Sequence, residues 1–248
     1  MLKKSIQIII TIIILTIVII QFPRLFIDRQ FEYSLFKIHS NDRIELNEDV
    51  KNILDSVLIN LTQSDFYNDK EIFELYFVKD TFYEKLISVF GMNNIASSKY
   101  NKHIYIGYPE FRKNTLTKEG NEYEWLNLVQ VVTHEAVHSQ MYTDYSKFGF
   151  MVTPSWINEG YAEYISYYKI REQHTYPLSK LFERYQKSNH NWVKTEFGSL
   201  TPKQYLRDRI LIEYLIDEKT MSIDDIIKDE YLKPEEILEE IKEKYLEN

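Results

Sequence analysis

The stretch VVTHEAVHSQMY, residues 131–142, places two histidines four positions apart, with a glutamate directly after the first. On a helix, side chains at positions i and i+4 leave the same face, one turn apart. His134 and His138 can therefore supply two imidazole ligands to a tetrahedral zinc ion, which binds nitrogen and oxygen donors. A zinc site with these two histidines still lacks a third protein ligand. The spacing alone is also compatible with two histidines that bind nothing.

The segment WINEGYAEY downstream contains two glutamates, Glu159 and Glu163. The interval after His138 has room for a loop over 142–155 and a second helix that packs back on the first. Glu159 can then serve as the third ligand. Glu163 lies one turn later on the same helix face, where it can accept a hydrogen bond from a ligand histidine and fix its tautomer. Glu135, beside the first histidine, can act as general base toward a water on the metal.

The motifs HEAVH and WINEGYAEY together resemble those of the gluzincin metallopeptidases, the thermolysin-like clan, and in particular the small bacterial peptidase MA-like domains. The resemblance covers about residues 100–218. It implies one Zn2+ ion bound by His134, His138 and Glu159, with Glu135 as the general base and Glu163 as the acid behind a ligand histidine. It also implies an edge strand before the metal helix, over residues 103–107, that pairs with the backbone of a peptide substrate.

The same resemblance leaves two candidates for the group that stabilises the oxyanion. Gluzincins use a Tyr or a His, and the segment QYLRDRILIEYL, residues 204–215, is similar to the helix that carries it. Arg209 stands where a Tyr is usual, and Tyr205 lies one turn earlier. Arg209 could stabilise an oxyanion or bind a substrate carboxylate, because a cation is useful where negative charge develops. It could equally form an ion pair with Glu213, at position i+4.

The first 27 residues are rich in Ile and Leu and carry no charge between Lys4 and Arg24. As a helix, this interval spans about 28 Å, close to the hydrocarbon thickness of a bilayer, about 30 Å. We therefore expect a cytoplasmic tip and transmembrane anchor over 1–27, with membrane contact through residues 5–23. Lys3 and Lys4 predict a cytoplasmic N-terminus, and hence a single-pass cell-membrane protein with an extracytoplasmic catalytic domain. A cleaved signal peptide is the alternative, although no A-x-A pattern follows.

The remaining sequence predicts a polar connector over 28–45 and one catalytic domain over 46–248. Apolar spacing predicts a helix over 50–61 capped by Asn47, and short strands over 72–78 and 103–108. Further helices are expected over 81–91, 122–142, from Trp156 to 170, and near 178–188, 201–218, 222–229 and 233–247. The predicted fold class is α+β, with an N-terminal transmembrane helix followed by a zincin-like domain with a small sheet and a mainly helical C-terminal part.

Composition excludes several classes of function. The formal net charge is −8 and no basic stripe is present, so nucleic-acid binding is not expected. The chain has no cysteine, which excludes disulfides and thiolate chemistry. His103, His174 and His190 lack spaced partners and are expected to be solvated or strand-edge residues.

The function expected from these observations is a membrane-anchored, extracytoplasmic zinc metallopeptidase. Its partner would be a peptide or protein substrate, whose bond is hydrolysed by zinc-activated water with Glu135 as the base. Two alternatives stay open. One is a catalytically degenerate interaction or sensor module with the same fold, and the other is a hydrolase that acts on a different bond.

Overall fold

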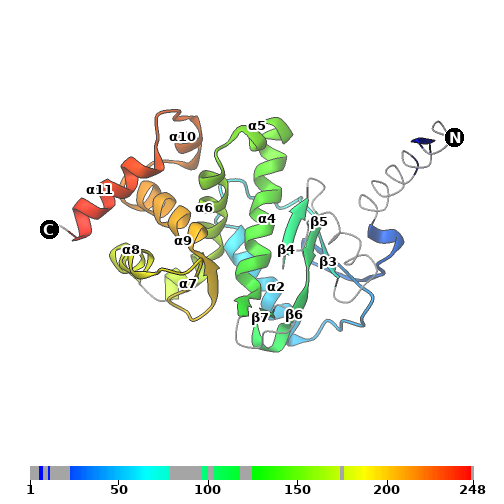
Figure 1. The fold of residues 1–248 in the computed structure, drawn as a ribbon. Helices are drawn as coiled ribbons and strands as arrows, with labels where there is room; N and C mark the ends of the chain where they lie inside the picture. Colours follow the sequence, from blue (N-terminus) through cyan, green and yellow to red (C-terminus); the bar gives the residue numbers. More distant parts are fainter. Residues whose placement is uncertain are drawn as a thin grey trace.

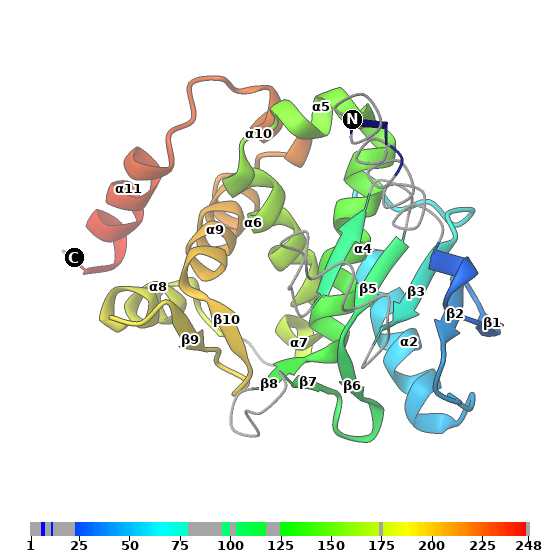
Figure 2. The same cartoon turned by 45° about the vertical axis from the view of Figure 1, so that its right-hand side comes forward.

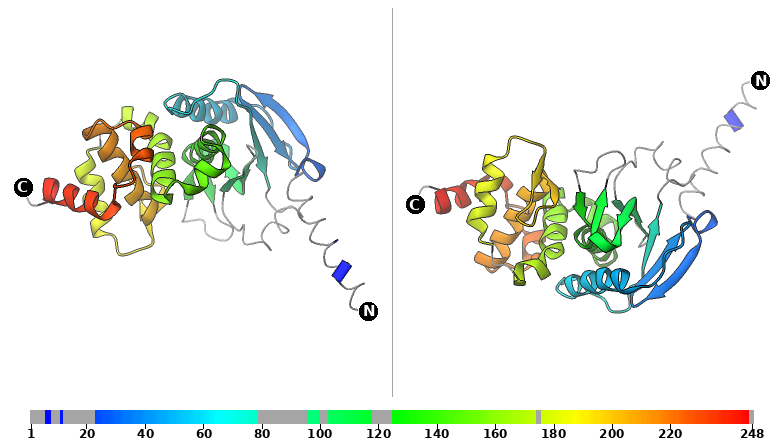
Figure 3. Two further views of the ribbon diagram at one scale, coloured as in Figure 1. Left: turned by 90° about the horizontal axis from the view of Figure 1, so that it is seen from above. Right: turned by 90° about the horizontal axis from the view of Figure 1, so that it is seen from below.

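The structure is a computed structural model that describes residues 6–7, 11, 23–78, 96–99, 103–117, 125–173 and 176–246. A long helix, α4 (Leu128–Asp144), runs through the middle of the molecule. A mixed sheet with helix α2 (Glu48–Leu61) lies on one side of α4, and the C-terminal helices lie on the other (Figure 1). Views from above and from below show the same division between the blue-to-cyan and the yellow-to-red parts of the chain (Figure 3).

The larger sheet has five strands in the order β1-β2-β3-β5-β4. Its members are β1 (Arg29–Tyr33), β2 (Phe36–Ser40), β3 (Phe73–Phe77), β4 (Ala96–Lys99) and β5 (His103–Ile106). Strands β2, β3 and β5 are parallel, whereas β1 and β4 pair antiparallel at the two ends of the order. The strands predicted over 72–78 and 103–108 are thereby confirmed in β3 and β5.

One face of this sheet forms the core with α2 and α4. Alternate residues of a strand point to the same face, so Ile38, Leu75 and Ile104 line up across β2, β3 and β5 and are all buried. The side chain of Asn47 caps α2 by accepting a hydrogen bond from the amide of Val50 at 3.0 Å. The predicted helix over 50–61 and its predicted cap are therefore confirmed.

A second, three-stranded sheet leads into α4. It consists of β6 (Tyr108–Glu110), β7 (Thr115–Thr117) and β8 (Trp125–Asn127), with a 3-10 turn, η2 (Phe111–Lys113), between the first two strands. The side chain of Asn127 accepts a hydrogen bond from the amide of Gln130 and caps α4. Helix α4 therefore begins at Leu128 rather than at the predicted residue 122, because the residues before it pair with β7.

The C-terminal part is mainly helical, as predicted. It contains α5 (Ser146–Val152), α6 (Ser155–Ser166), α7 (Tyr168–Gln173), α8 (Leu178–Lys187), α9 (Lys203–Glu213), a π-helical turn η3 (Tyr214–Glu218), α10 (Ile223–Lys228) and α11 (Pro234–Leu246), and a hairpin of β9 (Trp192–Lys194) and β10 (Leu200–Pro202). Helix α6 packs between α4 and α9 (Figure 2).

The crossing of α6 and α9 requires a glycine. A Cβ atom on Gly160 would lie 2.4 Å from the backbone oxygen of Asp208 and 2.7 Å from Cγ1 of Ile212. Atoms do not approach that closely without a shift of backbone, so a larger residue at position 160 would push the two helices apart. Gly160 therefore sets how closely α6 and α9 approach each other.

The predicted transmembrane helix is corrected by the structure. Among the residues that it describes, no helix is long and apolar enough to cross a membrane. A spanning helix needs about 20 apolar residues, whereas the 3-10 turn η1, Pro23–Leu25, has three residues. Apart from residues 6, 7, 11 and 23, the predicted membrane segment 5–23 lies outside the described residues. The fold class is therefore corrected to α+β without a described membrane span, and the predicted single-pass localisation is not supported.

Three further sequence predictions differ from the structure or lie outside it. Residues 28–45, predicted as a connector, contain β1 and β2, whose polar side chains masked the strand pattern. The predicted edge strand over 103–107 is wrong, because β5 lies between β3 and β4. The strand at that end of the order is β4, whose short sequence ASSK carries no apolar signal. The helix predicted over 81–91 lies outside the described residues.

Candidate metal centre

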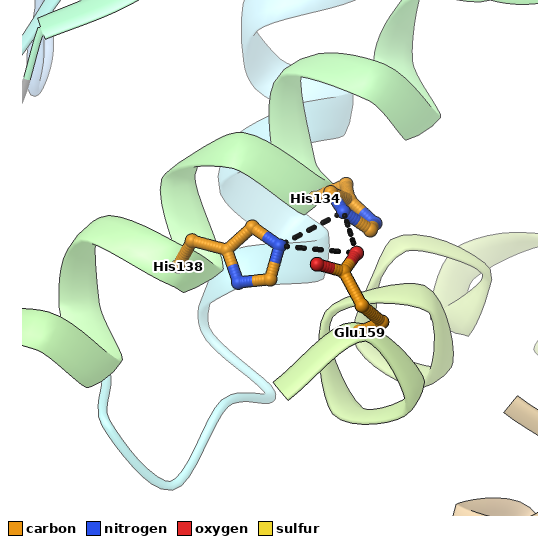
Figure 4. Close-up of side chains that lie close together, drawn as sticks. All are labelled: His134, His138 and Glu159. Carbon is orange, nitrogen blue, oxygen red and sulfur yellow. Dashed lines mark hydrogen bonds and ion pairs between the residues drawn. The ribbon is translucent and has the colours of Figure 1, made fainter. Parts of the chain in front are cut away.

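Helices α4 and α6 bring three ligand atoms to one point (Figure 4). The two Nε2 atoms of His134 and His138 are 3.0 Å apart. Oε2 of Glu159 lies 3.2 Å from Nε2 of His134 and 3.5 Å from Nε2 of His138. The structure therefore brings together the three residues that the sequence proposed as ligands, from helices that are separated by α5 in the chain.

The spacing of these atoms fits a metal ion. With metal–ligand bonds of about 2.0–2.2 Å, two corners of a tetrahedral site are about 3.3–3.6 Å apart, and the three separations are within about 0.3 Å of that range. Among the described residues, the buried Oε2 of Glu159 makes no hydrogen bond of good geometry. Such an oxygen is costly to bury unless a cation or donor satisfies it. This group of two histidines and one carboxylate could hold a metal ion.

A second carboxylate, that of Glu163, lies beside the other ring nitrogen of His134. Oε1 of Glu163 lies 3.5 Å from Nδ1 of His134, on the opposite side of the ring from the ligand atom. Burial lowers the pKa of His134, but Glu159 and Glu163 outweigh it and hold that pKa well above the usual value. Burial likewise raises the pKa of Glu159, and the two histidines reverse the effect and leave it lowered. Both shifts favour a charged imidazole beside a charged carboxylate, and a metal ion would compete with a proton for the same nitrogen atom.

Tyr205 of α9 packs against His134. Its ring stacks on the ring of His134, with centroids 5.4 Å apart and an angle of 16° between the planes. Burial raises the pKa of the Tyr205 hydroxyl, and the charges of Glu159 and Glu135 raise it further. The ring of Tyr205 therefore lies against one of the candidate ligands, and its hydroxyl is in the electric field of both carboxylates. Tyr205 is therefore well placed to donate a hydrogen bond to a group bound at the centre.

Arg209, the other oxyanion candidate, occupies a different environment. Its side chain is 1% exposed, and its guanidinium pairs with Glu196 at 3.0 Å and with Glu213 at 3.1 Å. The guanidinium carbon also lies 3.9 Å from the centre of the Tyr167 ring. The alternative interpretation of Arg209, an ion pair with Glu213 at position i+4, is therefore confirmed. The pair is buried rather than on the surface.

Two residues of the WINEGYAEY segment have roles that the sequence reasoning missed. Asn158 donates hydrogen bonds from Nδ2 to the backbone oxygens of Phe150 and Thr153, at 3.2 and 3.4 Å, and so ties α6 to the end of α5. Gly160 allows the close approach of α9. Both residues are direct sequence neighbours of Glu159. This position could have suggested their roles, since a residue next to a ligand often fixes the backbone that carries the ligand.

No protein-family model matches the chain, and neither a curated protein nor a solved structure matches it.

Proposed function

We propose that this chain is a zinc-dependent peptidase of the gluzincin type. The observation that carries the proposal is the convergence of His134, His138 and Glu159 with separations suited to a tetrahedral ion. Three protein ligands with nitrogen and oxygen donors are typical of catalytic zinc sites, which leave a fourth position open. A structural zinc site usually has four protein ligands, so a three-ligand set favours catalysis.

The residues around the ligand set supply the other parts of a hydrolytic site. When bound, a zinc ion supplies a Lewis acid that lowers the pKa of a water molecule and polarises a carbonyl group. Glu135 accepts the proton of the attacking water and later delivers it to the leaving amine. The hydroxyl of Tyr205 donates a hydrogen bond to the oxygen on which negative charge develops. Glu163 keeps the ring of His134 in one tautomer and one orientation.

Replacement of the base tests this proposal most directly. Glu135→Gln keeps the shape of the side chain and removes its basicity, so peptide hydrolysis by the zinc-loaded protein should fall about 100- to 10,000-fold. Bound zinc should stay at about one ion per chain, because Glu135 is not a ligand. Cleavage is followed by mass spectrometry of an unstructured peptide mixture, and Glu236→Gln on α11 serves as an exposed control.

Each part of the proposal can fail separately. If the wild-type protein binds no zinc, the metal centre is wrong. If it binds zinc and cleaves no peptide, or if Glu135→Gln cleaves as fast as the wild type, the peptidase mechanism is wrong. A zinc-loaded protein that binds peptides without cleaving them would support the interaction module instead.

A further inference from the structure

Helix α8 and the hairpin of β9 and β10 form a basic region in a chain that is acidic overall. Residues 178–203 contain five Lys or Arg and two Glu, whereas the formal net charge of the whole chain is −8. The side chain of one of these glutamates, Glu196, is 1% exposed and pairs with the buried Arg209. The charge that this region presents to solvent is therefore more positive than its composition indicates.

An exposed tryptophan lies within this basic region. Trp192 is 45% exposed, and it leaves the same side of β9 as Lys194, because alternate residues of a strand point the same way and Val193 is buried between them. Nη1 of Arg184 donates a hydrogen bond to the backbone oxygen of Lys194 at 2.7 Å and so holds a second cation beside the strand. Lys187 of α8 is exposed as well. We call Arg184, Lys187, Trp192 and Lys194 the basic surface.

Helices α10 and α11 carry the opposite charge at the same end of the molecule. Residues 222–246, which we call the acidic segment, contain nine Asp or Glu and four Lys. Helix α11 contacts α8, and both lie at the end opposite the large sheet (Figures 1 and 2). Two large apolar side chains of the segment are exposed, Tyr231 at 86% and Leu246 at 50%. Two neighbouring regions of one chain therefore have complementary charge.

These two regions do not neutralise each other within one chain. Among the described residues, the only carboxylate that pairs with a cation of α8 is Glu183, on α8 itself. Arg184 and Lys194 pair with no described carboxylate. All four Lys of the acidic segment pair with carboxylates of that segment or of η3. Complementary charges that stay unpaired in one chain can pair between two chains.

We propose that the chain forms a two-fold homodimer in which the basic surface of each copy packs against the acidic segment of the other. A two-fold axis makes every contact occur twice, so both regions of both copies are used. The exposed Trp192 and Tyr231 are aromatic side chains of the kind that dominates the binding energy of interfaces, and the charges select the partner and its orientation. A second copy is the favoured occupant because the complementary region is present on the same chain. The inference does not depend on the proposed peptidase function.

Sedimentation equilibrium of the full-length, zinc-free chain tests the dimer. The wild type should be dimeric at low ionic strength, and raising the ionic strength from about 0.05 M to about 0.5 M should weaken the dimer about 10-fold or more, because exposed charges are screened. Each of two double variants should be monomeric at the same concentration, since like charges then face each other. The first is Lys187→Glu with Lys194→Glu, and the second is Glu235→Lys with Glu239→Lys. All four side chains are exposed, so circular dichroism should show an unchanged fold.

An equimolar mixture of the two double variants is the sharpest measurement. The first variant has acidic charge in both regions and the second has basic charge in both, so the mixture should restore the dimer that neither variant forms alone. The matched control is Arg43→Glu with Lys70→Glu, which reverses two exposed cations in the segments that flank α2. This control changes the net charge as much as the first variant does and should leave the dimer intact.

Three results would overturn the inference. A monomeric wild type would exclude the dimer, and a mixture that stays monomeric would show that the two regions do not face each other. A dimer that both double variants leave unchanged would place the interface elsewhere, as association through the apolar N-terminal residues would. A monomeric wild type that binds poly-glutamate, with the binding lost in Lys187→Glu with Lys194→Glu, would assign the basic surface to a different acidic partner.

Discussion

Two clusters of histidine and glutamate in the described part of the chain have similar composition and different chemistry. The first, which we call the sheet cluster, lies on the face of the large sheet opposite α4. Its carboxylate, Glu74, accepts hydrogen bonds from Nε of Arg24 at 3.0 Å and from the hydroxyl of Tyr76 at 2.6 Å. Nε2 of His103 and of His39 lie 3.4 and 3.8 Å from the same carboxylate. Glu74 is thus already neutralised by a protein cation.

The metal cluster, His134, His138 and Glu159, lacks such a cation. No Lys or Arg in the described residues forms an ion pair with Glu159; its partners are the two histidines. The two imidazoles direct their Nε2 atoms at each other, which is unfavourable unless a proton or a metal ion lies between them. Proximity of histidine to glutamate is therefore a weak criterion for a metal site. The two clusters differ in whether an arginine of the protein pairs with the carboxylate.

The largest expected effect contrasts the two carboxylates. Glu159→Gln should weaken zinc binding by roughly 100-fold or more, because a metal ligand is lost. Glu74→Gln should leave zinc at one ion per chain, because Glu74 pairs with Arg24. Isothermal titration and elemental analysis measure both quantities, and circular dichroism checks that each variant folds. Equal loss of zinc in both variants would remove the distinction between the clusters.

A smaller effect is expected from the carboxylate behind His134. Glu163→Gln should weaken zinc binding about 10- to 100-fold, because the ring of His134 loses the acceptor that fixes its tautomer. Glu183→Gln, at a partly exposed glutamate of α8 that pairs with Lys180 and Lys187, is the control and should leave the affinity unchanged. An affinity equal to that of the wild type would show that Glu163 serves the packing of α6 and not the metal.

The smallest expected effect is a pH dependence of stability in the sheet cluster. Burial, and then the charges of Arg24 and His103, lower the pKa of His39 from 6.5 to about 4. Its contribution to stability is therefore present above pH 6.5 and is lost as the pH falls toward about 4, because the unfolded chain binds the proton first. His39→Phe, which keeps a flat ring against Tyr76, should reduce the decline over this interval by about 1–3 kcal/mol. Urea unfolding of the metal-free protein at several pH values measures it.

A control substitution and the direction of the pH dependence distinguish the effect of His39 on stability from that of the other histidines. His190→Phe changes an exposed histidine and should leave the pH dependence as in the wild type. In the metal-free protein His134 acts in the opposite direction, since its raised pKa gives stability at low pH that is lost as the pH rises through that pKa. A steeper acid decline in His39→Phe than in the wild type would contradict the assignment of a neutral His39.

The sequence predicted those parts of the site that depend on the geometry of a single helix. The spacing of His134 and His138, and of Glu159 and Glu163, follows from the helical repeat. The segment between α4 and α6 was predicted as a loop, and the structure forms helix α5 within it. Tyr205 and Arg209 are different, because their surroundings depend on how α9 crosses α6. The partner Glu196, which lies outside any helix, could not be identified from the spacing that suggested Arg209.

The sheet was predicted less completely for a related reason. Strands β3 and β5 are mostly apolar and are recognisable in the sequence. Strands β1 and β4 have the same lengths but carry more polar side chains, and they become strands through pairing with their neighbours. The edge strand was therefore assigned to residues 103–107, in β5, instead of to β4. The start of α4 was also misplaced, since apolar residues before Leu128 fit a helix as well as a strand.

The candidate ligands come from two helices, one on either side of α5. This arrangement affects how long the folded protein would persist in the cell. An ion bound by His134, His138 and Glu159 would crosslink α4 to α6 and would bind the folded chain in preference to the unfolded one. Its binding free energy would then add to the free energy of unfolding, by about 2.7 kcal/mol when free zinc exceeds the dissociation constant 100-fold. A chain deprived of zinc would open between these helices more often and meet cellular proteases sooner, so that its abundance would follow the supply of the metal.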